Sequence, residues 1–337
     1  MRIQFPLKIE FEITSKCNLG CKHCMLKLSQ KEEMSKLQIC GLIDEWVSNG
    51  LLELQLTGGE PLLRNDLLDI ILYARKKGLK VLVSTNGTLI TEEFSKQLSN
   101  TGAFIEVSLD GSCEFVHDSI RGKGSFNKTI TGIKMLKNYN NKVMLETVIQ
   151  KGNYEDLENI CALSYELGAY RHLFHSLRIS KPEIKLLQLG REEMIDAQRR
   201  IFRLREKYDM QIQPPYLPVD KYFEQQGKQL FDNKVFGCGA LKFKCGVTAD
   251  GDMYPCLLFS GIDDFKIGNV LNDNVKNMWN STLALKIYDS FNGHSPDDCK
   301  KCVAYNDCDY GCKKVSYEFN GDFISQDISC PYSKGFL

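Results

Sequence analysis

The sequence predicts an α/β protein in which an open, partial barrel of six βα units is followed by a small cysteine-rich domain. Two observations carry this prediction. Strand-like and amphipathic helical segments alternate from residue 7 to about residue 180, as in a parallel sheet covered by helices. Eight of the 14 cysteines then fall between residues 238 and 330, where long periodic segments are scarce. Six units favour a partial TIM-like (β/α)6 barrel over a closed barrel of eight.

The alternation can be followed unit by unit along the chain. Each short apolar segment is followed by a segment whose apolar residues recur three and four positions apart. The predicted strands cover residues 7–14, 52–59, 80–87, 103–111, 142–150 and 171–179. The predicted helices cover residues 36–48, 66–77, 91–100, 126–139, 154–167 and 192–207. Because chemistry in such folds sits at the carboxyl ends of the strands, we expect the turns after these strands to meet at one mouth.

Composition divides the chain further. The barrel is expected to occupy residues 1–212, and residues 213–237 are interpreted as a connector because prolines near its start break the alternation. Residues 238–337 are rich in Cys, Gly, Asp and Asn, which is typical of a small domain stabilised by metal sites.

Charge and hydropathy limit the partners. The 43 basic and 43 acidic residues cancel, so no basic excess predicts binding to nucleic acid or to an anionic membrane. No signal-peptide pattern and no apolar run of about 18 residues is present, which predicts a cytoplasmic protein. In that reducing compartment, clustered cysteines indicate metal ligands rather than disulfides.

Residues 15–25, SKCNLGCKHCM, place Cys17, Cys21 and Cys24 in one loop after the first predicted strand. A disulfide uses an even number of cysteines, and a structural zinc ion usually takes four ligands. A cubane iron–sulfur cluster is normally held by four thiolates. Three cysteines would leave one iron open for a ligand that carries an amine and a carboxylate.

The spacing CxxxCxxC directly after a first strand resembles the signature of the radical S-adenosylmethionine (SAM) superfamily. The resemblance implies that Cys17, Cys21 and Cys24 hold a [4Fe–4S] cluster whose open iron binds SAM. Reductive cleavage of SAM would give a 5′-deoxyadenosyl radical, which abstracts a hydrogen atom from the substrate. The protein would orient the cofactor and exclude side reactions. On its spacing alone, the loop also fits part of a zinc site.

Candidate SAM contacts stand at the ends of later strands. Gly58, Gly59 and Glu60 occupy the position of a family motif that contacts the SAM amino group, and glycine permits close backbone approach. Short polar side chains that suit the ribose and adenine are Ser84, Asn86, Ser108 and Asp110. Arg121 is the candidate partner of the SAM carboxylate. The alternative for the residues at the strand ends is that they only form turns, and the alternative for Arg121 is that it is a solvated surface residue.

The C-terminal cysteines are similar to the SPASM extension of radical SAM maturases, which implies two auxiliary [4Fe–4S] clusters. By the family's crossed pattern, auxiliary cluster I would be held by Cys238, Cys245, Cys256 and Cys312. Auxiliary cluster II would be held by Cys299, Cys302, Cys308 and Cys330. Taken without the barrel, these cysteines would also fit zinc sites. With the N-terminal cluster, the resemblance implies three [4Fe–4S] clusters and SAM.

Three cysteines remain outside the clusters. Cys40 and Cys161 lie in helical segments and are expected in the core. Cys113 follows the fourth strand at the predicted mouth, where a catalytic thiol could return a hydrogen atom to a substrate radical, as epimerisation requires. A packed or idle thiol is the alternative. His23 takes the place of a family aromatic that packs on adenine, and the other four histidines are expected to be structural.

The resemblance implies modification of a peptide, a ribosomally made precursor, through a thioether or carbon–carbon crosslink or by epimerisation. Eight C-terminal cysteines would ligate both auxiliary clusters fully, which favours electron relay over binding of the substrate to iron. Only 16 residues precede Cys17, so we expect that a separate protein, or none, recognises a leader peptide. The expected electron donor is of the flavodoxin or ferredoxin type. Leu257 stands where sulfatase maturases have a catalytic Asp, which argues against formylglycine formation.

Two other functions stay open at this point. One is radical SAM modification or decarboxylation of a haem-type or other small cofactor precursor. The other is a non-enzymatic module that binds zinc or iron–sulfur clusters.

Overall fold

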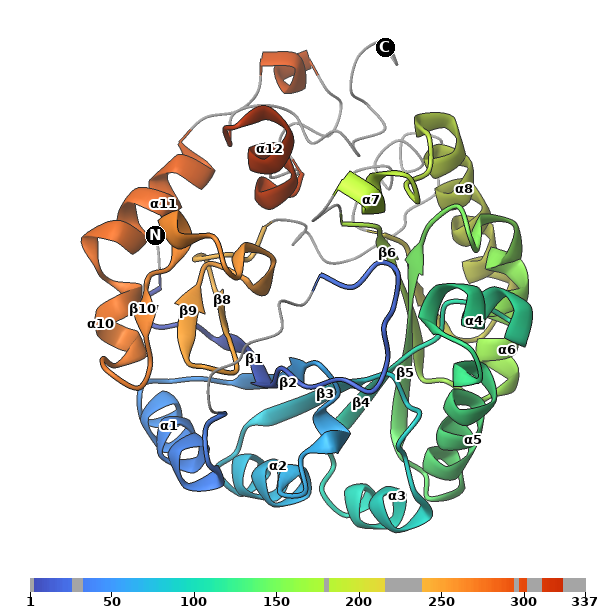
Figure 1. The fold of residues 1–337 in the computed structure, drawn as a ribbon, viewed down its shortest axis with the longest axis horizontal. Helices are drawn as coiled ribbons and strands as arrows, with labels where there is room; N and C mark the ends of the chain where they lie inside the picture. Colours follow the sequence, from blue (N-terminus) through green and yellow to red (C-terminus); the bar gives the residue numbers. More distant parts are fainter. Residues whose placement is uncertain are drawn as a thin grey trace.

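The computed structural model describes residues 3–25, 33–178, 182–215, 238–293, 297–301 and 311–323. These residues form one sheet of ten strands in the order β10-β9-β8-β1-β2-β3-β4-β5-β6-β7 (Figure 1). Strands β1 to β8 pair in parallel, whereas β9 and β10 run antiparallel to their neighbours. The strands are β1 Lys8–Thr14, β2 Glu53–Gly58, β3 Lys80–Thr85, β4 Phe104–Ser108, β5 Lys142–Ile149, β6 Arg171–Ser176, β7 Gln211–Gln213, β8 Lys244–Val247, β9 Asp252–Tyr254 and β10 Gly268–Asn269.

Except for the short helix that follows β6, the helices of the barrel lie on the outer side of the curved sheet (Figure 1). They are α1 Lys36–Ser48, α2 Leu67–Lys76, α3 Glu92–Ser99, α4 Glu114–Arg121, α5 Ser125–Asn138, α6 Leu157–Glu166, α7 Pro182–Lys185 and α8 Arg191–Lys207. The C-terminal helices are α10 Val275–Trp279, α11 Thr282–Asn292 and α12 Lys313–Asn320, with short 3-10 turns at Leu257–Phe259, Asp263–Phe265 and Asp297–Lys301. In the described ranges, no helix has the length and apolar character of a membrane-spanning segment.

Strand β1 shows that the sheet has one apolar face, toward the helices, and one polar face, toward the inside of the barrel. Its alternating residues Ile9, Phe11 and Ile13 are buried, and the Phe11 ring packs edge-on against Trp46 of α1 at 5.6 Å. Glu10 and Glu12 therefore point to the inside of the barrel, because successive strand side chains face opposite ways. The inside of this barrel is polar where a closed barrel would be apolar.

All six predicted βα units are present, with boundaries close to those expected, so the predicted fold class is confirmed. Helix α4 and strand β7 were not predicted. A further difference is that the cysteine-rich part extends the sheet, since β8 pairs with β1. This pairing covers backbone groups that an edge strand would leave open.

The barrel and the C-terminal part also share a hydrophobic core. One cluster of buried side chains includes Ile9 and Trp46 from the barrel together with Phe259 and Trp279 from the C-terminal part. The Trp279 indole nitrogen donates to the Ile3 carbonyl at 2.9 Å. Residues 216–237 lie outside the described ranges, and the predicted boundaries at 212 and 238 stay predictions.

Candidate active site

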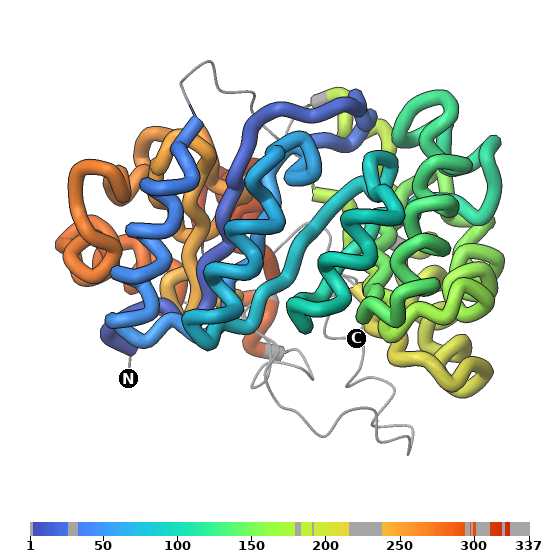
Figure 2. The backbone as a smooth tube through the Cα atoms, turned by 90° about the horizontal axis from the view of Figure 1, so that it is seen from below, coloured from blue at the N-terminus to red at the C-terminus, as the bar shows by residue number. Residues whose placement is uncertain are grey.

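A cavity of about 480 Å³ lies at the carboxyl ends of the barrel strands. The sequence-predicted residues that line it are Cys17, Cys21, His23, Cys24, Gly58, Gly59, Ser84, Asn86, Ser108, Arg121 and Cys256. Polar residues that line it but were not predicted include Glu10, Glu12, Gln55, Glu146, His175 and Lys244. Figure 2 shows the segment after β1, in dark blue, crossing the upper end of the barrel. The predicted mouth therefore forms, with the cysteine loop on one side.

The three loop cysteines lie close enough to interact electrostatically. Burial raises the pKa of the Cys17 and Cys21 thiols, and the neighbouring Cys24 raises both further. The loop is fixed by a Cys24 N–H bond to the Cys21 carbonyl at 3.1 Å. A bond from the Lys22 N–H to the Ile120 carbonyl, at 3.0 Å, attaches the loop to α4. All three cysteines line the cavity from one loop, and three thiolates are the number that a cubane with one open iron takes, so their role as cluster ligands stays a prediction.

Glycines at the end of β2 let this loop lie against the sheet. A Cβ on Gly58, whose φ is +120°, would lie 2.2 Å from the Thr14 carbonyl oxygen. A Cβ on Gly59 would lie 2.0 Å from the Lys16 carbonyl oxygen. Both glycines thus permit a close backbone approach by the start of the cysteine loop, and their predicted contact with SAM stays a prediction.

Glu60 joins the ends of two strands. Its carboxylate accepts the Leu62 N–H at 3.0 Å and the Thr85 hydroxyl at 2.7 Å through Oε1, and the Asn86 N–H at 2.8 Å through Oε2. Burial raises the pKa of Glu60, and these bonds partly offset that rise. The side chain is fully buried and is not part of the cavity lining. Its predicted contact with SAM stays a prediction.

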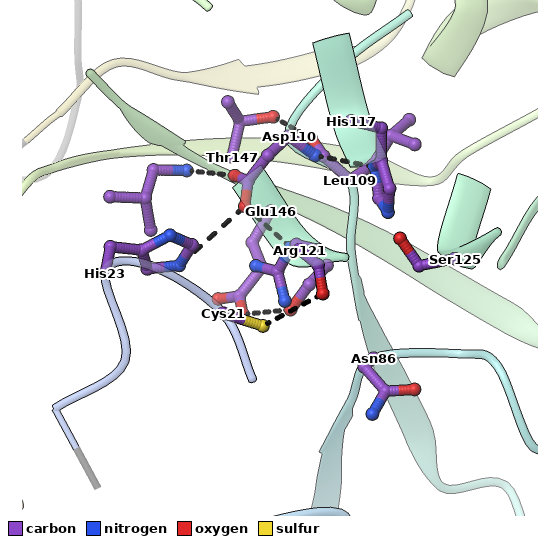
Figure 3. A network of polar contacts seen from close by, with 12 residues as sticks. Cys21, His23, Asn86, Leu109, Asp110, His117, Arg121, Ser125, Glu146 and Thr147 are labelled. Atoms are coloured by element: carbon purple, nitrogen blue, oxygen red, sulfur yellow. Dashed lines mark hydrogen bonds and ion pairs between the residues drawn. The ribbon is translucent and has the colours of Figure 1, made fainter. Parts of the chain in front are cut away.

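Asp110 holds Arg121 at the cavity wall (Figure 3). The Arg121 Nε donates to Asp110 Oδ2 at 2.6 Å, and the Val148 N–H donates to Oδ1 at 2.8 Å. His23 Nε2 lies 3.7 Å from the same carboxylate. Burial opposes ionisation of Asp110, but Arg121, His23 and Val148 outweigh it and lower its pKa. Asp110, expected at the ribose or adenine, instead lies behind the wall and orients Arg121.

The two predicted serines are held by carboxyl groups, that of Glu106, which is buried, and that of Glu146, which lines the cavity. The Ser84 hydroxyl donates to Glu106 at 2.9 Å, and Gln55 donates to Ser84 at 2.9 Å. The Ser108 hydroxyl donates to Glu146 at 2.9 Å. Burial, followed by repulsion from Glu146, raises the pKa of Glu106 to about 8.

Asn86 links the cysteine loop to β3. Its amide nitrogen donates to the Asn18 side-chain oxygen at 2.9 Å, and its side-chain oxygen accepts the Thr88 N–H at 2.9 Å. Asn86 therefore forms a turn and also lines the cavity, and its predicted contact with SAM stays a prediction.

The carboxyl groups inside the barrel were missed in the sequence. Glu12 lines the cavity, and burial together with nearby Asp250 raises its pKa to about 8. Glu10 and Glu106 also occupy interior positions of strands. In KIEFEIT, charged and apolar residues alternate, which is the pattern of a strand with one polar and one apolar face. This alternation could have predicted that the polar face lines the inside of the barrel.

The histidines differ from the expectation in one case. His117 accepts the Asp110 N–H at 3.3 Å, and burial lowers its pKa to about 4. His172 is fully buried against Thr147 at 2.9 Å. Both are structural, as expected, whereas His175 lines the cavity with its Nε2 at 3.6 Å from Glu146. His294 lies outside the described residues.

The cysteines outside the clusters occupy three environments. Cys161 is fully buried in α6, as expected, but Cys40 in α1 is only partly buried. Cys113 is exposed at the start of α4 and is not part of the cavity lining. Because Cys113 does not line the cavity, the structure does not support the predicted hydrogen-atom transfer, which stays a prediction.

Of the eight C-terminal cysteines, five lie in the described ranges. Cys302, Cys308 and Cys330 are outside them, so the predicted auxiliary cluster II can be followed only at Cys299, which is buried. Burial raises the pKa of Cys238 and Cys256, and interactions with Cys312 raise both further. Among the described residues no group of three or more His, Cys, Asp or Glu side chains could hold a metal ion, and the predicted ligands of auxiliary cluster I stay predictions.

Comparisons with known families match both halves of the chain. The model of the radical SAM superfamily matches residues 11–163, and the model of the SPASM iron–sulfur cluster-binding domain matches residues 238–303.

Similar curated proteins fall into two groups. An AdoMet-dependent heme synthase of Methanosarcina barkeri is 29% identical and covers 98% of this chain and 97% of its own length. The mycofactocin maturase MftC of Mycolicibacterium smegmatis is 28% identical over 93% of this chain and 79% of its own. The subtilosin biosynthesis protein AlbA of Bacillus subtilis is 29% identical over 88% of this chain and 64% of its own.

Solved structures with the same fold include two further enzymes. SuiB of Streptococcus suis, bound to the precursor peptide SuiA, has a TM-score of 0.81 with 16% identity, over 97% of this chain and 76% of that chain. Native anSMEcpe with bound AdoMet has a TM-score of 0.77 with 19% identity, over 97% and 94% respectively. At these identities the likeness establishes the fold alone.

Proposed function

From the premise that this chain belongs to the radical SAM superfamily, is an enzyme and carries a SPASM domain, we propose that it matures a peptide. The substrate would be a ribosomally made precursor. The product would carry a thioether or carbon–carbon crosslink, or an epimerised residue.

The observation that carries this proposal is that a single cavity is lined by predicted cluster ligands from both parts of the chain. Cys17, Cys21 and Cys24 line one part, and Cys256 of the SPASM domain lines another. A substrate segment in this cavity would reach the site of radical formation and the nearest auxiliary cluster together. When bound, SAM and its cluster supply the carbon-centred radical.

The chain's own residues would bind and orient the cofactor. Arg121, fixed by Asp110 at 2.6 Å, would pair with the SAM carboxylate. Ser84 and Ser108, each held by a carboxyl group at 2.9 Å, would present fixed hydroxyls to the ribose. The buried polar network behind them keeps these side chains in place before SAM binds.

The cofactors and partners follow from the same proposal. Besides the radical SAM cluster, the SPASM cysteines would hold two auxiliary [4Fe–4S] clusters, which gives three. A flavodoxin- or ferredoxin-type protein would supply electrons, and a separate protein would recognise the leader peptide.

The charges of the cavity support a peptide over a polyanionic tetrapyrrole. Three cations line the cavity: Lys244 is paired with Glu10 at 2.6 Å, Arg121 is held by Asp110 at 2.6 Å, and the third is Arg178. Glu146 adds a carboxyl group to the lining. The propionates of a haem precursor would meet this carboxyl group, whereas a neutral or basic peptide segment would not be repelled.

A haem-type precursor is the second candidate, favoured by the similarity to heme synthases along almost the whole chain. The two are separated with anaerobically reconstituted, reduced enzyme and SAM. One reaction receives a peptide encoded by a short reading frame beside the gene, and the other receives iron coproporphyrin. We expect 5′-deoxyadenosine and a modified peptide in the first, and neither with Cys21→Ala. A modified tetrapyrrole and an unchanged peptide would refute the proposal.

A further inference from the structure

A carboxyl group and an imidazole lie next to each other on the wall of the cavity. Glu146 of β5 and His175 of β6 both line it, and they are called here the Glu146–His175 dyad. The His175 Nε2 lies 3.6 Å from Glu146 Oε2, while Glu146 Oε1 accepts the Ser108 hydroxyl at 2.9 Å. An imidazole oriented by a carboxyl group is a common form of general base in enzymes.

The pairing of the strands explains why both side chains face the inside of the barrel. Ser108 lies beside Glu146 across β4 and β5, and Val148 lies beside His175 across β5 and β6. Successive side chains of a strand point to opposite faces. Phe174, the residue before His175, is buried with side chains of α6 and α8 on the outer side of the sheet. Ser108, Glu146 and His175 therefore form a row across three neighbouring strands.

The dyad borders the proposed SAM site. Ser108, which donates to Glu146, is a candidate ribose contact, and Glu146 also interacts electrostatically with Arg121, the candidate partner of the SAM carboxylate. On its other side, His175 interacts electrostatically with Lys244 of the C-terminal part. The dyad therefore lies between the proposed cofactor site and the part of the cavity lined by the SPASM domain, which is where a substrate segment would lie.

The surroundings of His175 keep its imidazole neutral and able to accept a proton. Desolvation inside the barrel lowers the pKa of His175 most. Of the charged groups that face it, Glu146 and Asp110 raise this pKa, whereas Arg178 and Lys244 lower it. The His175 side chain is nevertheless 45% exposed, and it lines the cavity. A molecule bound in the cavity can therefore contact a neutral imidazole.

The other ionisable groups on the described part of the cavity wall are less suited to accept a proton. Glu10 is already engaged in an ion pair at 2.6 Å. Burial raises the pKa of Glu12 to about 8, so this residue holds its own proton at neutral pH. Both ring nitrogens of His23 face protein groups, at 3.3 Å and 3.7 Å. Leu257, on the SPASM side of the cavity, is apolar. The dyad is therefore the best-placed base.

We propose that His175, oriented by Glu146, is the catalytic base that accepts the proton released when the peptide is crosslinked. This role rests on the proposed function, for which it names a catalytic residue. Crosslinking joins a peptide C–H group to a second group X–H, in which X is sulfur or carbon. The hydrogen atom of the C–H bond goes to the 5′-deoxyadenosyl radical, and the C–X bond forms. One electron passes to an oxidised iron–sulfur cluster of the SPASM domain, and the proton of X–H passes to His175.

Product analysis of the full-length, reconstituted and reduced enzyme tests this role, with SAM and the peptide encoded beside the gene. We expect His175→Ala to form 5′-deoxyadenosine but about 100-fold less crosslink per 5′-deoxyadenosine, because a general base contributes about that factor. Added imidazole should restore part of the crosslink, since it replaces the missing base. Glu146→Gln, which removes the orienting charge, should lower the same ratio less.

Ser176→Ala is the matched control for these variants. Ser176 is the next residue of β6, and its buried hydroxyl has no hydrogen-bond partner among the described residues. We expect wild-type crosslinking from this variant, with and without imidazole. Crosslinking by His175→Ala at the wild-type ratio would overturn the role of the base. A wild-type enzyme that forms no 5′-deoxyadenosine with this peptide would instead count against the proposed function.

Chemical labelling of the wild-type protein gives a second readout that needs neither a variant nor turnover. Diethyl pyrocarbonate modifies accessible imidazoles, and mass spectrometry of the digested protein locates the modified residues. In the unreduced, reconstituted protein with SAM, we expect His175 to be modified, and the peptide to protect it. His172, which is fully buried, should stay unmodified in both samples. Equal modification of His175 with and without a peptide that induces 5′-deoxyadenosine in the reduced enzyme would refute contact between substrate and base.

Discussion

A methyl group at Gly59 should displace the cysteine loop from the sheet. The Cβ of Gly59→Ala would lie 2.0 Å from the Lys16 carbonyl oxygen and 3.1 Å from the Cys17 nitrogen. Atoms at such positions stay at least 3.0 Å apart, so the two backbones must separate by about 1 Å. Gly59 has no positive φ, and the effect therefore reports the contact and not backbone strain.

The cost falls on both stability and cluster binding. Forced overpacking of this kind costs about 1–3 kcal/mol. A displacement of about 1 Å at Cys17 is also enough to misplace a cluster ligand, because sites need their ligands within about 0.5 Å. We expect lower stability in urea unfolding of the apo protein and, after reconstitution, loss of about four of 12 irons.

Gly41→Ala provides the matched control. Gly41 lies in α1 with nothing within 4 Å of its Cβ position, and the change should stabilise the helix by about 1 kcal/mol. Gly59→Ala protein with wild-type stability, iron content and SAM cleavage would refute the reasoning.

Four further changes test other parts of the site. Glu60→Gln places the amide NH2 group against at least one of the three hydrogen-bond donors that Glu60 now accepts from. Urea unfolding should show that the free energy of unfolding falls by about 2–4 kcal/mol. An unchanged unfolding midpoint would contradict the role of Glu60 in joining the two strand ends. Asp110→Asn leaves buried Arg121 without its counter-ion and should cost about 3 kcal/mol and weaken SAM binding by calorimetry; full retention of both would argue against orientation of Arg121. Because folded Glu106, with a pKa of about 8, holds its proton more tightly than the unfolded chain, wild-type stability should fall as pH rises from about 5 to 8. Glu106→Gln should flatten this fall in urea titrations at each pH, and an equally steep fall would refute the assignment. Cys113→Ala should leave the products unchanged, since the thiol is exposed outside the cavity lining, and loss of an epimerised product would establish the predicted hydrogen-atom transfer.

The fold was largely readable because the βα alternation is regular. Helix α4 was not predicted: its eight residues, EFVHDSIR, lie between an Asp-Gly turn and the GKG that follows, and so short a segment shows little helical periodicity. Strand β8 is only four residues long, and its partner β1 lies far away in the chain. Pairing between distant short segments leaves no local pattern in the sequence.

The sequence predicted which residues lie near the site better than it predicted where their side chains point. The loop cysteines, the glycines and the serines all reached the cavity, as their position after strands predicts. Asp110 and Glu60 were placed at the cofactor, but buried hydrogen-bond donors take up their oxygens. The position of Cys245 depends on which face of β8 it occupies, and the spacing between cysteines does not contain that information.

The pairing of β8 with β1 also bears on the order in which the protein is made. Lys244 and Glu10, which bond at 2.6 Å, are separated by 234 positions. A ribosome adds about 5–20 residues per second, so β1 waits on the order of 10 seconds or more for this partner. Until then its edge is open to pairing with other nascent chains. Delivery of iron and sulfide to the first loop should therefore be most productive after synthesis has passed β8.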